Sequence, residues 1–319
     1  MSVHVEELEE LRLPLTRYCY RLLGSAADCD DAVQETFLRV AAKADEYDPT
    51  RARLTTWVHA IATNVCLDML RGARRRAMAM DLVPAADGAD IGTPLSADHW
   101  VEPVPGARLF GQSDPAESAV ERDTVRLAIV ALLQRLPPRQ RAIVVLRDVL
   151  AFSAQETAQV IDCSVAATNS ALQRARATLR AARSGPDEVG YPTDAQQRAL
   201  VDRYVSAFES HDVDALTALL RDDASSSMPP FAWWIQGGAR IAALMGSTDA
   251  CANDRLLRTD VNGRPGLGQY RPDDDGELRP FAIISIEQTA DRISHIATFL
   301  NAADRFCEFG LPSALGASR

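Results

Sequence analysis

Hydrophobic residues recur with a helical period in two stretches of the chain, residues 5–76 and 123–183. In "DCDDAVQETFLRVAAK", Val33, Phe37 and Val40 are four and three residues apart, which predicts one buried helical stripe. The polar residues of this helix are left exposed, and a solvated face is their simplest interpretation. These residues are Asp30, Asp31, Gln34 and Glu35.

A second helix is predicted over "TTWVHAIATNVCLDMLRGARRR", continuing through Arg76. Beside its apolar stripe runs a line formed by Trp57, Asn64, Asp68 and Arg71, with Arg74 and Arg75 further along. An aromatic ring followed by polar groups suits unstacked bases and base edges. A tryptophan anchored on the core beside a polar face explains the same pattern, so both interpretations stay open.

The second stretch, residues 123–183, predicts a helix-turn-helix. Pro138 suits the first turn of a helix. Ser153 and Glu156 have the spacing of a capping box, and a turn at "IDCS" separates that helix from an arginine-rich one. The outward residues of the last helix are Asn169, Ser170, Gln173, Arg174 and Arg176. A generic two-helix hairpin is the alternative, but outward arginines favour DNA.

The C-terminal part predicts a mixed α and β unit. "QQRALVDRYVSAFESHDVDALTALLRDDASSSMPP" reads as two amphipathic helices, and "FAWWIQGGARIAALMG" as a short strand and a third helix. Asn262-Gly263 indicates a hairpin, and two further strands follow. Neighbouring strand residues point to opposite faces, so Trp233 and Trp234 are not expected to share a cavity. The same alternation puts Ile293 and His295 on one face.

Composition limits the class of protein. The net charge is −10, so nucleic acid would have to meet local arginine clusters rather than a basic surface. No apolar run approaches the ~20 residues of a membrane span, and the acidic N-terminus does not resemble a signal peptide. The six cysteines form no pattern typical of zinc. We therefore expect a cytoplasmic protein without a metal or other cofactor.

The order of four segments resembles the sigma-70 family of bacterial transcription initiation factors, in particular its extracytoplasmic-function group. These segments are "DDAVQETFLRV", "TTWVHAIATNVCLDMLRGARRR", "LPPRQRAIVVLRDVLAFSAQETAQVI" and "ALQRARATLR". The resemblance implies that the chain binds core RNA polymerase, through its β′ and β subunits, and promoter DNA. The polymerase supplies the catalysis, so no catalytic residue is expected.

The resemblance also assigns roles by position. The acidic helix with Asp30 and Glu35 would dock on the coiled coil of β′. The loop from about Tyr47 to Leu54 and the helix after it would read the −10 element, capturing a flipped base. The helix-turn-helix would read the −35 element in the major groove. Many relatives carry Lys and Arg where this chain has Asn169 and Ala171, which implies weaker attraction to phosphates.

Residues 194–307 resemble the SnoaL-like group of the NTF2-like fold, and the resemblance implies regulation in cis. His295 would touch a small ligand if its face lined the cone; a structural histidine is the alternative. Trp100, isolated among prolines, is similar to a linker motif of such sigma factors. Trp100 would dock between domains, as would Trp233 and Trp234. The alternative for Trp100 is local packing on region 2.

The expected fold class is therefore multidomain: two all-α sigma domains followed by an α+β NTF2-like cone. The expected boundaries are 5–76 for region 2, 77–122 for the linker, 123–183 for region 4 and 194–307 for the cone. Two other functions stay open. One is a small-molecule cyclase or isomerase fused to a DNA-binding module, and the other is a helix-turn-helix regulator that works without polymerase.

Overall fold

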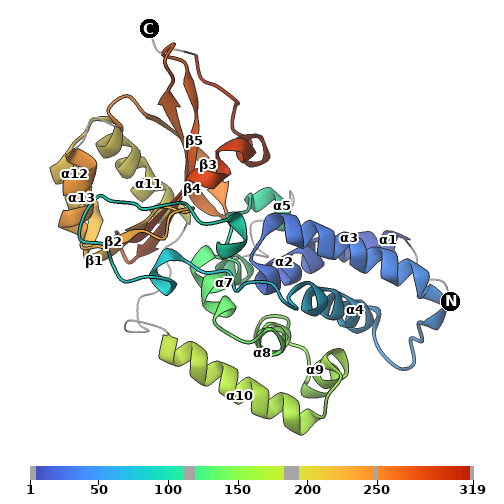
Figure 1. Cartoon of the computed structure of the whole chain (residues 1–319). Helices are drawn as coiled ribbons and strands as arrows, with labels where there is room; N and C mark the ends of the chain where they lie inside the picture. Colours follow the sequence, from blue (N-terminus) through green and yellow to red (C-terminus); the bar gives the residue numbers. More distant parts are fainter. Residues whose placement is uncertain (1–4, 111–118, 183–193, 248–250, 317–319) are drawn as a thin grey trace. The chain divides into compact units, whose positions relative to one another are not determined.

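The computed structural model describes residues 5–110, 119–182, 194–247 and 251–316 (Figure 1). The chain divides into two units. The first comprises residues 1–77 and 107–185, and the second comprises residues 78–106 and 186–319. The second unit therefore takes in most of the segment that the sequence identifies as a linker.

The first half of the helical unit is a bundle in which α2, α3 and α4 pack on one another. Its elements are α1 (Val5–Glu10), α2 (Arg12–Leu23), α3 (Ala26–Ala42), the 3-10 turn η1 (Ala44–Glu46) and α4 (Leu54–Met69). Ser25 starts α3, since its hydroxyl accepts the backbone N–H of Asp28. Leu15, Val40 and Val58 are fully buried and mark the core of this bundle.

The arginine run after α4 does not continue the helix, so the predicted extent to Arg76 is wrong. α4 ends at Met69, and Gly72 has a φ of +77°. Glycine adopts this left-handed conformation without steric cost, which lets the chain leave the helix there. Arg71, Arg74 and Arg75 are exposed in the irregular segment that follows.

The second half of the helical unit contains the predicted helix-turn-helix. Its elements are α5 (Gly106–Phe110), α6 (Ala119–Thr124), α7 (Leu127–Gln134), α8 (Pro138–Val144), the π-helical turn η5 (Val145–Val149), α9 (Ala154–Ile161) and α10 (Val165–Ala182). Pro138 occupies the first turn of α8, and the capping box of Ser153 and Glu156 starts α9. Asp162, with a φ of 54°, makes the turn into α10. These three predictions are confirmed.

The second unit has α11 (Asp194–Glu209), α12 (Val213–Leu219) and α13 (Gly238–Gly246), which share a core with a mixed sheet. The strands are β1 (Leu220–Ser227), β2 (Trp234–Gln236), β3 (Arg255–Val261), β4 (Arg264–Pro272), β5 (Leu278–Thr289) and β6 (Arg292–Phe299). Their order in the sheet is β2-β1-β6-β5-β4-β3. Short 3-10 turns complete the unit: η2 (Ala79–Asp81), η3 (Ala97–His99) and η7 (Leu300–Phe309). The predicted class, helical domains followed by an α+β unit, is confirmed.

Two details of this sheet test the strand predictions. Asn262 and Gly263 both have positive φ and join β3 to β4 as a two-residue hairpin, as predicted. Strand β1 contradicts the prediction that "RDDASSS" belongs to a helical segment. Asp and Ser have little preference for strands, so nothing local marks this one. It forms because β2 pairs with it on one side, antiparallel, and β6 on the other, parallel.

A bulge in β6 changes which face His295 occupies. Ile293 pairs with Gln288, but His295 pairs with Glu287, so Ser294 is an extra residue in this strand. Ile293 consequently joins the core cluster with Ile296, whereas His295 lies outside that cluster. The prediction that Ile293 and His295 share a face is wrong, because strict alternation fails at a bulge.

Candidate functional site

The exposed face of α3 combines acids with one large apolar side chain. Asp30, Asp31 and Gln34 are exposed, and Leu38 on the same face is 60% exposed. Two grooves flank Leu38, with volumes of about 630 and 390 Å³. Leu38 and the two grooves beside it together make this face a candidate docking surface for another protein. Leu38 lies four residues after Gln34, on the side of the helix that the sequence predicts to be exposed, but no motif in the sequence marks it.

Two of the acids on this face already have cationic partners. Glu35 accepts a hydrogen bond of 2.7 Å from Arg39 on the same helix. Asp30 forms an ion pair with Arg108 of α5, a second residue that the sequence did not mark. Asp31 and Gln34 line the grooves beside Leu38.

The α4 face holds the predicted line of aromatic and polar side chains. The ring of Trp57 lies 5.1 Å from that of Tyr47, which comes from the loop before the helix. Asn64 and Asp68 are exposed further along. Asp68 lies 3.1 Å from Arg71 and 3.7 Å from Arg39, so this carboxylate joins α4 to α3. The face therefore offers a ring, an amide and several arginines.

The outward side of α10 presents the predicted reading residues. Asn169, Ser170, Gln173 and Arg174 are exposed. Arg176 differs, because its guanidinium donates two hydrogen bonds to Asp148 of η5, at 3.0 and 2.5 Å. A bidentate pair fixes the orientation of both side chains. Arg176 thus joins α10 to the preceding part of the unit.

Both adjacent tryptophans contact the linker. Trp233 is 3% exposed in the core, and its indole N–H donates to the carbonyl of Gly88 at 3.0 Å. The indole of Trp234 donates to Val83 at 2.8 Å. Two linker side chains, Ala86 and Ile91, pack against the core of this unit. The linker thus lies along the segment that carries the two tryptophans.

A second contact holds the end of the linker. The backbone of Val104 exchanges two hydrogen bonds with Asn262, at 2.7 and 3.0 Å. A Cβ added to Gly106 would lie 2.1 Å from a carboxylate oxygen of Asp260, so a larger residue there would have to displace that side chain. Trp100, between the two contacts, is fully buried. Residues 78–106, the part of the linker that belongs to the second unit, are therefore attached to that unit near both ends.

His295 lies between two hydroxyls. Its Nδ1 is 2.8 Å from Ser225 Oγ, and its Nε2 is 3.3 Å from Ser227 Oγ. Burial lowers the pKa of His295 to about 4. His295 pairs with Ser225 and lies outside the core cluster that the helices share with the sheet. Among the residues that the structure describes, no cluster of His, Cys, Asp and Glu could hold a metal ion.

A second buried histidine lies in the helical unit. His59 is 1% exposed, and its Nδ1 donates to the carbonyl of Thr55 at 2.8 Å. Its Nε2 has no hydrogen-bond partner among the described residues. Burial lowers the pKa of His59 to about 4 from an ordinary value of 6.5. The ring is therefore neutral in the folded unit.

The free energy of unfolding of the helical unit is expected to fall between pH 6.5 and pH 4. In that pH range His59 is protonated in the unfolded chain but stays neutral in the folded unit. The contribution of His59 to the free energy of unfolding is therefore fully present above pH 6.5 and decreases on acidification. Urea titrations of the full chain at several pH values measure the slope, and His59→Phe should reduce it. His211→Gln, at a partly exposed turn, is the control. An unchanged slope in His59→Phe would contradict the assignment.

Comparison with known proteins bears on both units. The family model for sigma-70 region 2 matches residues 8–76, and that for sigma-70 region 4 matches residues 126–179. The chain is 40% identical to the ECF RNA polymerase sigma factor SigG of Mycobacterium tuberculosis over 312 residues, which is 96% of this chain and 83% of SigG. SigJ of the same organism is 30% identical over 223 residues, 70% of this chain and 64% of SigJ.

The solved structure of Mycobacterium tuberculosis SigJ shares the fold of the whole chain. It matches with a TM-score of 0.62 and 24% identity, covering 97% of this chain and all of that one. In the part of the chain that the structure describes, no helix is long and apolar enough to cross a membrane.

Proposed function

This chain belongs to the extracytoplasmic-function group of the sigma-70 family. From this premise we propose which of its surfaces binds RNA polymerase and which bind promoter DNA. The exposed Leu38 among acids carries the proposal. A single apolar side chain between two grooves suits an anchor, and the surrounding acids suit basic side chains on a partner. We assign this face to the coiled coil of the polymerase β′ subunit.

The remaining surfaces fit promoter DNA. Trp57, seated on Tyr47, offers a ring on which an unstacked base can stack, and Asn64 and Arg71 offer groups for base edges and phosphates. We assign these residues to the −10 element, with Asp68, Arg74 and Arg75. We assign recognition of the −35 element to four exposed residues of α10: Asn169, Ser170, Gln173 and Arg174. Arg176 would position this helix through its hydrogen bonds to Asp148.

The second unit acts on the first through the linker. Hydrogen bonds at Val83 and Val104 attach residues 78–106 to this unit near both ends, so unfolding of the unit would release the segment that connects region 2 to region 4. Ala86 and Ile91 of the linker pack against the core of this unit. Both ring nitrogens of His295 lie within hydrogen-bond distance of serine hydroxyls. These contacts support regulation in cis without chemistry of its own, rather than a fused cyclase. The work would take place in the cytoplasm, with the polymerase.

Run-off transcription tests this function. Full-length protein mixed with core RNA polymerase is expected to start transcripts from a subset of genomic promoter fragments, and polymerase without it should not. Direct binding to core polymerase, measured by fluorescence anisotropy, should accompany the activity. Failure to bind the polymerase and to direct transcripts would exclude the sigma function and favour a regulator that works alone.

A further inference from the structure

The first turn of α10 presents an apolar surface to solvent. Val165 is 41% exposed, which places it with Leu38 and Leu82 as the exposed large hydrophobic residues in the part of the chain that the structure describes. Val165 precedes the buried Thr168 by three residues, so helical spacing alone would bury it on the same side. Ala166, next to it in this turn, is exposed as well. The start of α10 therefore exposes methyl groups.

Local hydrogen bonds fix the start of α10. The hydroxyl of Ser164 accepts the backbone N–H of Ala167 at 3.1 Å, so Ser164 is the N-cap of the helix. The hydroxyl of Thr168 donates to the carbonyl of Ser164 at 3.1 Å and lies 3.1 Å from the Sγ of Cys163. Val165 is β-branched, so its side chain has few rotamers in a helix. Little conformational entropy is therefore lost when a partner covers Val165.

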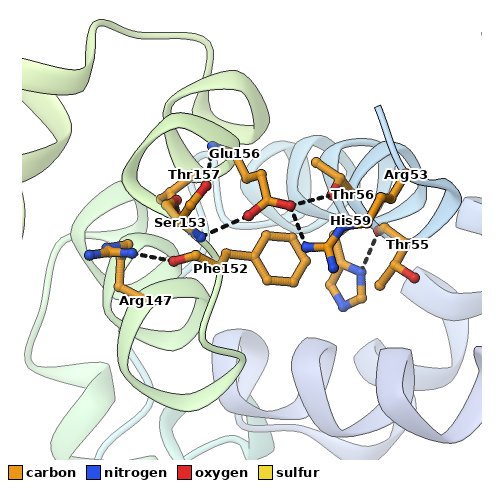
Figure 2. Close-up of polar contacts among 9 residues, drawn as sticks. All are labelled: Arg53, Thr55, Thr56, His59, Arg147, Phe152, Ser153, Glu156 and Thr157. Atoms are coloured by element: carbon orange, nitrogen blue, oxygen red, sulfur yellow. Dashed lines mark hydrogen bonds and ion pairs between the residues drawn. The ribbon is translucent and has the colours of Figure 1, made fainter. Parts of the chain in front are cut away.

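The helix that supports α10 is also fixed at its start. Figure 2 shows the capping box of α9, in which the backbone N–H of Ser153 donates to the carboxylate of Glu156 at 2.8 Å. Arg147 donates to the carbonyl of Phe152 just before this helix. The other carboxylate oxygen of Glu156 accepts a hydrogen bond from Arg53. Because α9 contacts α10, the helix-turn-helix presents the first turn of α10 in a defined direction.

The first two turns of α10 lack the cations that usually read guanine. In a helix-turn-helix, the N-terminal residues of the recognition helix contact the base edges. Residues 165–172 have the sequence "VAATNSAL", and the first cation of α10 is Arg174. Arg174 lies nine residues after Val165, about 13 Å along the helix axis. Since Arg or Lys on guanine is the commonest specific base contact, these two turns must recognise bases through other groups.

We propose that Val165 recognises a thymine of the −35 element by contact with its 5-methyl group in the major groove. The proposal rests on the assignment of α10 to that element. The thymine methyl is the apolar group that base edges present in this groove, and apolar side chains recognise it by contact. Asn169 is exposed one turn after Val165 on the same side of the helix, and its amide suits the N6 and N7 atoms of adenine. The two residues together favour A·T pairs at this end of α10.

Replacement of thymidine by deoxyuridine tests the proposal, because the two nucleosides differ only in the methyl group. The probe is a labelled promoter fragment that the full chain and core polymerase transcribe, with each thymidine of its −35 region, on either strand, replaced in turn. One replacement should weaken binding of the chain–polymerase complex, measured by fluorescence anisotropy, by roughly three- to fivefold, the value of one buried methyl group. Val165→Ala should bind the two fragments nearly equally. Alanine favours helix, so this variant should fold.

Thr178→Ser is the matched control, since it removes one methyl group from another exposed β-branched residue of α10 and keeps the hydroxyl that donates to Arg174. It should keep the wild-type preference for thymidine. If no deoxyuridine weakens binding, or if Val165→Ala keeps the full preference, the thymine contact is wrong. The −35 assignment still stands in that case if exchanging whole base pairs in the −35 region weakens binding. If such exchanges have no effect, or the chain directs no transcript, the assignment of α10 and the thymine contact both fall.

Discussion

Leu38→Asp is expected to weaken binding to core RNA polymerase by roughly thirtyfold or more and to remove most run-off transcription. An apolar anchor at the centre of an interface contributes about 2 kcal/mol or more, and a buried aspartate without a partner adds a desolvation cost. The side chain is 60% exposed in the free protein, so the fold should tolerate the change. Fluorescence anisotropy with labelled protein and core polymerase measures the affinity.

Leu82→Asp is the matched control for that experiment. Leu82 is another exposed leucine, at 39%, and it lies in the linker rather than on α3. Its replacement introduces the same charge without touching the proposed docking face. Equal loss of affinity in the two variants would show that charge in general, and not the α3 anchor, governs binding, and the assignment of that face would then be wrong.

Trp233→Ala should destabilise the second unit by about 3–5 kcal/mol, the usual cost of truncating a buried aromatic side chain to alanine. The indole is 3% exposed, and it also holds the carbonyl of Gly88. We therefore expect the linker near Gly88 and Ile91 to lose its attachment along with the core. Thermal unfolding followed by circular dichroism measures the stability. Limited cleavage by a protease that cuts beside apolar residues measures the release of the linker.

Trp234→Phe separates loss of the linker contact from loss of stability in the core of the second unit. It keeps an aromatic ring but removes the N–H that donates to Val83, so only the linker contact is lost. Its stability should stay within about 1 kcal/mol of the wild type, the usual net worth of one hydrogen bond. If Trp233→Ala unfolds the unit but transcription is unchanged, regulation through the linker is contradicted.

The helical regions could be predicted from the sequence because their determinants are local. Capping by Ser153 and Glu156, the proline that starts α8 and the stripe of Val33 and Val40 all act within a few residues. The Asn262-Gly263 turn is equally local, since its two positive φ values favour these residues. The family follows from the order of such segments.

Only the tertiary structure decided the features whose causes are distant in sequence. Strand β1 exists because β2 and β6 pair with it, and the bulge at Ser294 moves His295 out of the core. Nothing near Glu156 predicts that it meets Arg53, over a hundred residues earlier, and nothing near Trp234 predicts Val83. Sequence by itself determined most of the helical segments, the capping box of α9 and the family, because neighbouring residues set local backbone preference. Pairing partners, the face of a side chain and the attachment of the linker depend on which surfaces meet when the chain folds, and only the folded structure contains that information.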